Sequence, residues 1–373
     1  MSLFTAAEAS IDIAAIDYGP LAGLMGDPAV TEIMVNGHRE IWIERAGHLL
    51  RTDAAFDSEA QLMSLIWEIA VYVGRRVNRE EPMLDARLPD GSRVNAILPP
   101  VSLCGPVLTI RRFSAEAVDA EDLVATNSIS QPALDFLAAC VMSRRTVLIS
   151  GRTGSGKTTL LNVLSSYIPG GERIITIEDA AELKLHQNHW VRLETRPPDP
   201  AGVHQVTTRD LVRNSLRMRP DRIVVGECRG GEAFDMLQAM NTGHEGSMST
   251  VHANSPRDAL QRLETLCLMA GIDVPHRAIR DQIGSAIHVL VHLDRDIEGR
   301  RKVVHISEVV GREGEVVTMQ DIFTVQPSLS GDGTEELLPT KVRPRSLDSF
   351  VAVRHLLPPR LVRLYPDPRL MAA

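Results

Sequence analysis

The pattern of apolar and polar residues in the first third of the chain predicts strands joined by tight turns. Residues 32–35 and 40–44 alternate as half-buried strands do, and Asn36-Gly37 between them tolerates the positive φ angle of a tight hairpin turn. Asp90-Gly91 introduces a second hairpin, for which residues 93–98 and 107–113 are the expected strands. The residues up to about position 28 are weakly patterned and are expected to form a short leading helix or arm.

One helix is expected in the same region. Ser58 and Gln61 have the spacing of a capping box, in which a hydroxyl and an amide satisfy the first free backbone donors of a helix. Apolar residues then recur at helical spacing until Gly74, a residue type that commonly ends helices; they are Leu62, Leu65, Ile66, Ile69 and Val73. Residues 1–113 are therefore predicted to form one small α/β domain.

From residue 146 onward, short β-branched runs alternate with helical segments, which indicates a largely parallel sheet covered by helices. The expected helices are 157–167 and 255–270, the second with a Ser cap and a Pro in its first turn. The expected strands are 146–150, 173–178, 222–227 and 247–252. This predicts an α/β domain over residues 132–330, after a polar, acidic linker over 114–131. Residues 331–373 are expected to be a tail whose structure the pattern leaves open.

Composition and charge argue against several classes of function. Apolar residues make up 44% and charged residues 24%, as in ordinary soluble proteins, and the net charge of -8 offers no attraction for sequence-independent nucleic-acid binding unless a local basic patch exists. The four cysteines include no CxxC pair, which favours reduced thiols over a zinc site. The first residues lack the basic start of a signal peptide, and prolines interrupt the longest apolar run, residues 94–110, so a cytoplasmic location is expected.

The strongest chemical signal is a P-loop (Walker A) motif, GxxxxGK[ST]. Its glycines let backbone amides curl around a phosphate, and the following helix directs its positive end at the same anion. Lys157 is expected to reach the β- and γ-phosphates of ATP, and the Thr158 hydroxyl to ligate Mg²⁺. The predicted nucleotide-binding residues are Gly151, Arg152, Thr153, Gly154, Ser155, Gly156, Lys157, Thr158 and Thr159.

Carboxylates follow two of the predicted parallel strands. Glu178-Asp179 ends one strand, with Glu182 one helical turn further on, and Glu227 ends another. Ligands gather at the carboxyl ends of parallel strands, so these acids are candidates to face the phosphates, although each could alternatively cap a helix.

A histidine and several arginines are further candidates. His252 also ends a predicted strand, where it could be a buried core residue or a sensor of the γ-phosphate. Arg93, Arg111 and Arg112 in the first domain could neutralise transition-state charge if that domain folds over the P-loop. Arginines nearer the P-loop could simply form a solvated face.

Four segments in this order resemble the type II/IV secretion-system ATPases, hexameric motors of pilus assembly and secretion. They are the P-loop at 151–158, the acidic segment 176–182, the strand segment 219–227 and the segment around His252. Further sequence segments are similar to the proteins of the tight-adherence (Flp) pilus assembly branch, and they lie at 32–37, 82–95, 193–197, 216–221 and 236–247. The resemblance runs from about residue 27 to 323.

The resemblance implies a RecA-like motor domain, preceded by a PAS-like domain, in a ring of six subunits. It implies that Glu227 activates water and that Glu178 and Asp179 hold the magnesium shell. His252 would couple nucleotide state to the ring, and Arg93 and Arg111 match positions that reach the γ-phosphate in this family.

The chain departs from the family pattern in places. Arg152 stands where Gly is more common, the tetracysteine insert of the type II secretion branch is absent, and the N-terminal extension of the Flp group is short.

These features predict a hexameric ATPase, peripheral at the cytoplasmic face of the inner membrane, that drives a membrane platform protein of a pilus and does not bind nucleic acid directly. The main alternative is the same enzyme in a conjugative type IV secretion system. A DNA translocase and a nucleotide-binding scaffold without turnover are alternatives of other classes.

Overall fold

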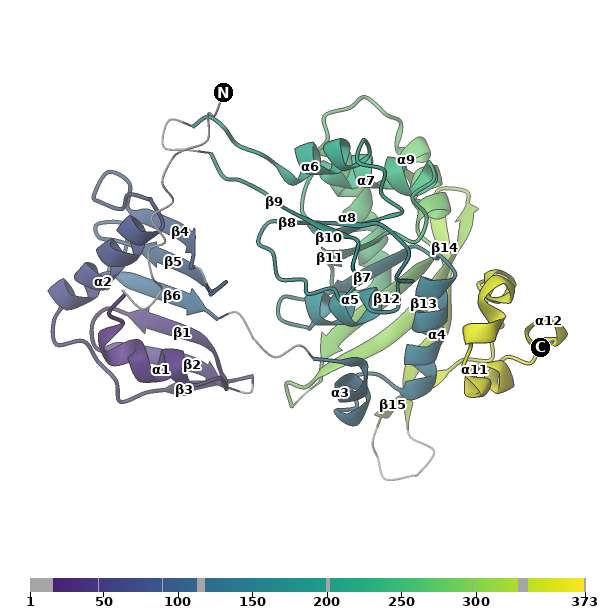
Figure 1. The fold of residues 1–373 in the computed structure, drawn as a ribbon, viewed down its shortest axis with the longest axis horizontal. Helices are drawn as coiled ribbons and strands as arrows, with labels where there is room; N and C mark the ends of the chain where they lie inside the picture. Colours follow the sequence, from purple (N-terminus) through teal and green to yellow (C-terminus); the bar gives the residue numbers. More distant parts are fainter. Residues whose placement is uncertain are drawn as a thin grey trace. The chain divides into compact units, whose positions relative to one another are not determined.

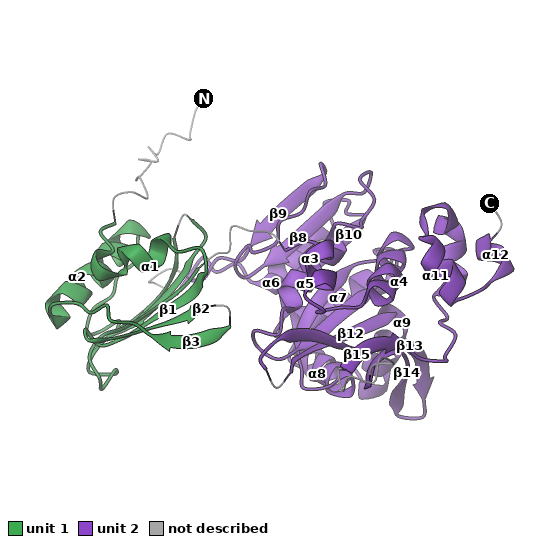
Figure 2. Ribbon diagram, turned by 90° about the horizontal axis from the view of Figure 1, so that it is seen from below, with its two compact units in different colours: residues 1–117 green, residues 118–373 purple. Residues whose placement is uncertain are grey.

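The computed structural model folds into two compact units, residues 1–117 (unit 1) and 118–373 (unit 2), shown in Figure 2. The structure describes residues 16–45, 47–88, 90–112, 118–198, 202–296, 298–327 and 335–371. Unit 1 has one apolar core, and unit 2 has two, which lie on opposite faces of its sheet. Each unit therefore buries apolar surface of its own.

Unit 1 is an antiparallel sheet of six strands in the order β3-β2-β1-β6-β5-β4, with helix α2 packed on it (Figure 1). Its elements are η2 (Gly19–Leu21), α1 (Ala22–Gly26), β1 (Val30–Asn36), β2 (Glu40–Arg45), β3 (His48–Arg51), α2 (Glu59–Tyr72), β4 (Met83–Arg87), β5 (Arg93–Ile97) and β6 (Val107–Arg111). A small α/β domain was predicted for this part of the chain, and unit 1 does contain both helices and strands, with more strands than helices.

The helix cap and the first turn predicted for unit 1 agree with the structure in part. The Ser58 hydroxyl accepts a hydrogen bond from the Gln61 amide at 3.3 Å, as predicted, but the Gln61 side chain accepts from the backbone of Asp57 rather than that of Ser58. Gly37 has a φ of +69°, yet the β1–β2 connection is three residues long because Asn36 pairs with Glu40.

The second predicted hairpin is placed differently. Asp90-Gly91 connects β4 to β5, and β4 was missed by the sequence prediction. Strands β5 and β6 do pair, but through a longer connection. The described part of the last predicted strand, 107–113, ends at Arg111, and Phe113 lies outside the described residues.

Unit 2 contains a nine-stranded sheet in the order β15-β14-β13-β12-β7-β11-β10-β8-β9. The six strands from β12 to β9 are parallel to one another, and β13, β14 and β15 continue the sheet antiparallel. The strands are β7 (Val147–Gly151), β8 (Ile174–Glu178), β9 (Trp190–Glu194), β10 (Arg222–Cys228), β11 (Met248–His252), β12 (Val289–Arg295), β13 (Arg301–Glu313), β14 (Val316–Pro327) and β15 (Glu335–Pro339). The predicted, largely parallel sheet is confirmed.

Helices cover both faces of this sheet (Figure 1), which explains why its central strands are apolar throughout. On β7, Val147 and Ile149 belong to one core and Leu148 to the other. The first core contains α4 (Gln131–Met142) and α5 (Lys157–Ser165). The second contains α6 (Thr208–Ser215), α7 (Glu232–Asn241), α8 (Pro256–Leu268) and α9 (His276–Ala286). The predicted Ser255 cap of α8 is present, since its hydroxyl accepts from the Asp258 amide at 3.1 Å.

The structure assigns elements to segments that the sequence pattern left open. In the predicted linker, α3 (Ala120–Ala125) begins at a capping box formed by Asp119 and Asp122. The predicted tail contains β15, α10 (Leu347–Phe350), η3 (Val351–Leu356), α11 (Pro359–Leu364) and α12 (Pro368–Met371). Phe350 and Tyr365 from this segment pack on Phe136 of α4, with ring centroids 5.8 and 6.4 Å apart. Residues 335–371 are therefore part of the core of unit 2.

Among the described residues, no helix combines the length and apolar character needed to cross a lipid bilayer.

Candidate nucleotide-binding site

The P-loop connects the end of β7 to the start of α5 and adopts a backbone that requires glycine. Gly154 and Gly156 have φ angles of +70° and +97°, which L-residues with side chains rarely adopt. A Cβ on Gly151 would lie 2.4 Å from the carbonyl oxygen of Leu293 on β12. The loop therefore passes too close to β12 for any side chain at this position. Its backbone amides and the N-terminus of α5 form the kind of concave cradle that binds phosphate.

Strand β12 also holds the apex of this loop. The Arg295 guanidinium donates two hydrogen bonds to the carbonyl oxygen of Gly154, at 2.9 and 3.2 Å. Sequence reasoning missed Arg295, because β12 itself was not predicted. The same rule that selected Glu178 and Glu227, a charged residue at the end of a parallel strand, would have found it.

Lys157, the P-loop lysine, begins α5 and is largely buried. Its ammonium donates to the carbonyl oxygen of Arg152 at 3.0 Å and lies 3.4 Å from Nδ1 of His252. The predicted magnesium ligand Thr158 and its neighbour Thr159 follow on the first turn of α5, both half-buried. The lysine thus already lies beside His252, which the sequence placed among the candidates.

His252 joins the lysine to Glu227. Nε2 of His252 lies 2.6 Å from Oε1 of Glu227, which ends β10, the neighbouring strand of β11. Burial, and then the nearby Lys157 charge, lower the pKa of His252 below its ordinary value. The ring is therefore neutral near pH 7. Since an ammonium can only donate, Nδ1 is its acceptor and Nε2 carries the ring proton. Oε1 of Glu227 is buried close to Nε2 but accepts no hydrogen bond from the described residues, so this oxygen is open to a ligand or water.

Arg229 connects Glu227 to Asp179, which follows β8. Its guanidinium lies 2.6 Å from Oε2 of Glu227 and 3.6 Å from Oδ2 of Asp179. Asp179 also accepts a hydrogen bond from the Thr208 hydroxyl at 3.0 Å. The hydrogen bond to Glu227 raises the pKa of Arg229 further. Arg229 was not among the predicted site residues, and only its position two residues after Glu227 pointed to it.

Glu178 is held differently from Asp179. One carboxylate oxygen accepts hydrogen bonds from the backbone amides of Glu182 and Leu183, at 2.8 and 2.9 Å. No helix lies in the fully described segment between β8 and β9, so the helix-capping alternative is wrong for Glu178, and these bonds hold the loop that follows β8. The other oxygen is buried and has no hydrogen-bond partner. Burial raises the pKa of Glu178 to about 7, against the effect of the two backbone bonds. A buried carboxylate of this kind is stabilised by any cation or water that reaches it.

Two buried polar atoms without hydrogen-bond partners suit a site for a nucleotide with Mg²⁺. The Ser155 hydroxyl in the P-loop, like the second oxygen of Glu178, is buried without a partner. Such atoms are rare in folded proteins and are expected where a ligand supplies the missing contact. In the described part of the chain, no group of three or more His, Cys, Asp and Glu side chains could hold a metal ion. A magnesium ion at this site would therefore draw on Thr158, phosphate oxygens and water.

Arg93 and Arg111, the two arginines predicted to reach the γ-phosphate, lie in unit 1. They are direct register partners on β5 and β6, and Glu32 of β1 pairs with Arg111 on its other side. Their two positive charges are thus side by side on one sheet. A role of either arginine at the phosphates stays a prediction.

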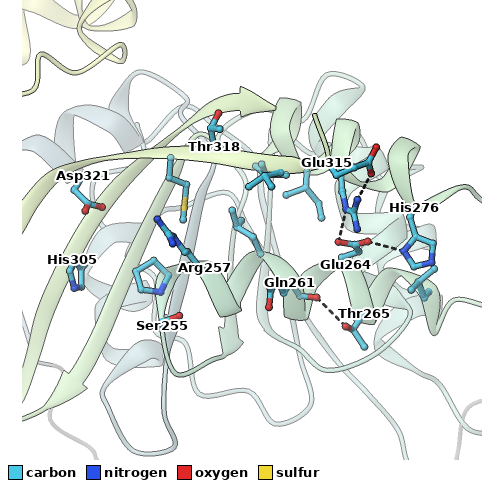
Figure 3. Close-up of a pocket in the computed structure, with 18 residues that line it drawn as sticks. Ser255, Arg257, Gln261, Glu264, Thr265, His276, His305, Glu315, Thr318 and Asp321 are labelled. Carbon is cyan, nitrogen blue, oxygen red and sulfur yellow. Dashed lines mark hydrogen bonds and ion pairs between the residues drawn. The ribbon is translucent and has the colours of Figure 1, made fainter. Parts of the chain in front are cut away.

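A separate groove of about 890 Å³ lies between α8, α9 and β14 (Figure 3). Leu260, Ile283 and Met319 contribute apolar surface to it. At one end, Glu264 pairs with His276 at 2.8 Å and with Arg280 at 3.0 Å. None of the predicted nucleotide-site residues lines this groove. Its ion pairs join α8 to α9.

Comparisons with known proteins identify the family of this chain. A family model described as "Type II/IV secretion system protein" matches residues 14–325. A putative conjugal transfer protein of Mycobacterium tuberculosis is 38% identical over 304 residues, covering 80% of this chain and 86% of that protein. The type IV secretion system protein PtlH of Bordetella pertussis is also 38% identical over 304 residues, covering 74% of this chain and 89% of PtlH.

Among solved structures, that of the pilus retraction motor PilT with bound ADP has a TM-score of 0.54 and 17% identity, and covers 94% of this chain and 90% of PilT. At this identity the likeness shows the fold alone. The predicted fold class, an α/β RecA-like P-loop domain preceded by a smaller domain, is confirmed.

Proposed function

This chain belongs to the type II/IV secretion system protein family, and from that premise we propose that it is the ATP-hydrolysing motor of a secretion machine. The observation that carries the proposal is the continuous contact from Lys157 through His252 to Glu227. It brings the phosphate-binding lysine and a strand-end carboxylate to the two sides of one neutral imidazole, and ATP hydrolysis at a P-loop needs a lysine on the phosphates and a residue nearby that orients the attacking water.

In this proposal separate residues bind the phosphates, orient the attacking water and hold the magnesium ion. The loop amides and Lys157 hold the β- and γ-phosphates, and Lys157 turns from the Arg152 carbonyl toward them. Glu227 orients the attacking water, while His252 and Arg229 fix its two carboxylate oxygens. Thr158 would ligate Mg²⁺, and the unpartnered oxygen of Glu178, together with Asp179, would hold the water shell of the ion. Bound magnesium would neutralise charge that develops on the phosphates.

The machine we propose is a conjugative or related type IV secretion system. The sequence resemblance favoured a Flp pilus, whereas the relatives reported above are named for conjugal transfer and type IV secretion, so they support the alternative better. The motor would act as a homo-hexamer, in contact with an inner-membrane platform protein at the cytoplasmic face. Arg93 and Arg111 would neutralise charge at the γ-phosphate.

Two variants test the enzyme. We expect Lys157→Ala to lose both ATP binding and turnover, because it removes the ammonium that holds the phosphates. We expect Glu227→Gln to bind ATP normally and to lose at least about a hundredfold in kcat, the scale of positioned acid–base groups. Glu245→Gln, the same change at an exposed position, is the matched control. Normal turnover by Glu227→Gln would refute the assignment of Glu227.

A second experiment separates the machines. In the source cell, loss of the gene should abolish conjugative transfer or secretion and leave surface pili intact. Loss of pili with normal transfer would instead support the Flp reading. Turnover that rises strongly when DNA is added to the purified protein would support a DNA translocase.

A further inference from the structure

A buried carboxylate at the start of α7 has no part in the mechanism described so far. Glu232 is the first residue of α7, and only 8% of its surface is exposed. Its Oε1 atom accepts hydrogen bonds from the backbone amides of Arg229 at 2.6 Å and of Gly230 at 2.8 Å. Among the residues that the structure describes, no Lys, Arg or His forms an ion pair with Glu232. Acidic side chains are rarely this buried without a basic partner, so the two amides stabilise its charge instead.

The two amides belong to the short loop that joins β10 to α7. Strand β10 ends at Cys228, one residue after Glu227, and α7 begins at Glu232. A Cβ on Gly231, the last residue of the loop, would lie 2.7 Å from the Cα atom of Ala270. The loop is therefore bound by the Glu232 carboxylate and packed closely against the segment that follows α8.

Arg229 connects this loop to the site. Its guanidinium lies 2.6 Å from Oε2 of Glu227 and 3.6 Å from Oδ2 of Asp179. The side chain is 55% exposed, so packing around it restricts its orientation little. A long, flexible side chain loses rotamer freedom when it is held in one orientation. The position of the Arg229 backbone, from which the side chain extends, therefore decides how often the guanidinium reaches Glu227.

We propose that Glu232 is a positioning residue, which fixes the backbone at Arg229 so that the Arg229 guanidinium orients Glu227. The inference rests on the proposed ATP hydrolysis and on the role of Glu227 in it. Both hydrogen bonds of the Glu232 side chain go to the loop after β10 and neither goes to the P-loop. Loss of Glu232 should therefore lower kcat and leave ATP binding in place, because small displacements of catalytic groups reduce the rate strongly.

Two substitutions of Glu232 separate its hydrogen bonds from its charge. Glu232→Gln keeps an oxygen that can accept from the same two amides, whereas Glu232→Ala leaves both amides without this partner. We expect Glu232→Ala to lower kcat about fivefold, which is part of the loss of about tenfold expected when Arg229 itself is replaced by Gln. We expect Glu232→Gln to lower kcat about twofold, and the KM for ATP to change less than about twofold in both variants.

The decisive measurement is the double variant with Arg229→Gln. If Glu232 acts through Arg229, Glu232→Ala should lower kcat by less than about a further twofold when Arg229 is already Gln. Asp119→Ala is the control, because it removes the same kind of bond at the start of another helix of unit 2, where Asp119 accepts from the Asp122 amide at 2.9 Å. It should keep the kcat of the unaltered protein. If Glu232→Ala does not fold, Glu232→Gln gives the same test, since its smaller loss should disappear in the Arg229→Gln protein.

The outcomes distinguish this inference from the proposed function. Unaltered kcat in Glu232→Ala, or losses that multiply in the double variant, would overturn the positioning role alone. Equal losses in Glu232→Gln and Glu232→Ala would also overturn it, since the charge rather than the hydrogen bonds would then be the cause. A raised KM at unaltered kcat would do the same, because it marks a role in binding. Absence of ATP turnover in the unaltered protein would overturn the proposed function, and the positioning role with it.

Discussion

The buried ion pair between Arg222 and Glu172 allows a stability prediction with a defined magnitude. Arg222 begins β10 and is fully buried, and its guanidinium donates to both carboxylate oxygens of Glu172, at 2.6 and 3.1 Å. It also donates to the carbonyl oxygens of Val141 and Gly246, at 2.7 and 3.2 Å. Replacing Glu172 by Gln keeps an acceptor of the same shape but leaves the buried guanidinium without a counter-charge.

Removing one partner of a buried ion pair costs about 3 to 5 kcal/mol of folding free energy. Two carbonyl groups still accept from Arg222, and Glu172 keeps slight exposure, so we expect Glu172→Gln to cost about 3 kcal/mol, at the lower end of that range. For a unit of this size the loss corresponds to a fall of roughly 6 to 12 °C in unfolding temperature. The double variant Glu172→Gln with Arg222→Met removes both charges and should recover at least half of the loss.

Scanning calorimetry of the full chain measures this, with the transition of unit 1 as an internal reference. Glu298→Gln is the control, because the ion pair of Glu298 with Arg300 is exposed and should contribute less than about 1 kcal/mol. The kcat of Glu172→Gln at 25 °C should be unchanged, since the pair lies at the opposite end of β10 from Glu227. A fall of less than about 2 °C, or a double variant less stable than Glu172→Gln alone, would refute the reasoning.

Three further predictions concern the site and the last part of the chain. Arg229→Gln should lower kcat about tenfold at unchanged KM, because Glu227 loses the 2.6 Å contact that orients it, and steady-state kinetics would show this. Protonation of His252 should not limit turnover until the pH lies below 6.5, the ordinary pKa of histidine, because its pKa is lowered, whereas protonation of Glu178, whose pKa is about 7, should lower turnover near neutral pH; a pH–kcat profile measures both. Deleting residues 341–373 should unfold unit 2, because burial of Phe350 and Tyr365 is worth several kcal/mol each, and circular dichroism would detect the loss.

Each of these has a clear contrary outcome. Arg229→Gln with unaltered kcat would show that His252 alone orients Glu227. A fall in turnover near pH 7 that persists in Glu178→Gln would mean that His252 is charged at neutral pH. A soluble, folded chain that lacks residues 341–373 would show that the aromatic contacts with Phe136 are dispensable.

The parts of the fold that the sequence predicted well are those that depend on neighbours in the chain. The run of buried residues from Val147 onward lies within one residue of the expected strand, because polar or glycine residues bound it on both sides. The Ser58 and Ser255 caps depend on the spacing of three residues alone. The P-loop is likewise a local motif, whose glycines meet a backbone requirement within a single turn.

The parts that sequence reasoning missed depend on contacts across the fold. Arg295 lies 141 residues from its partner Gly154, so the contact between them has no local signature. Arg229 was passed over because its partners, Glu227 and Asp179, meet only when β8 and β10 pair. Residues 335–371 were left open because their elements are short and are stabilised by packing on α4 rather than by their own pattern.

The contribution of residues 335–371 to the core around Phe136 also constrains how the protein emerges from the ribosome. Unit 1 is complete in sequence before synthesis of unit 2 begins, so it can fold while translation continues. The apolar surface of α4, by contrast, awaits aromatic partners made more than two hundred residues later. At typical elongation rates of about 5 to 20 residues per second, that surface stays uncovered for roughly ten seconds or longer. A nascent chain in this state is a natural substrate for chaperones.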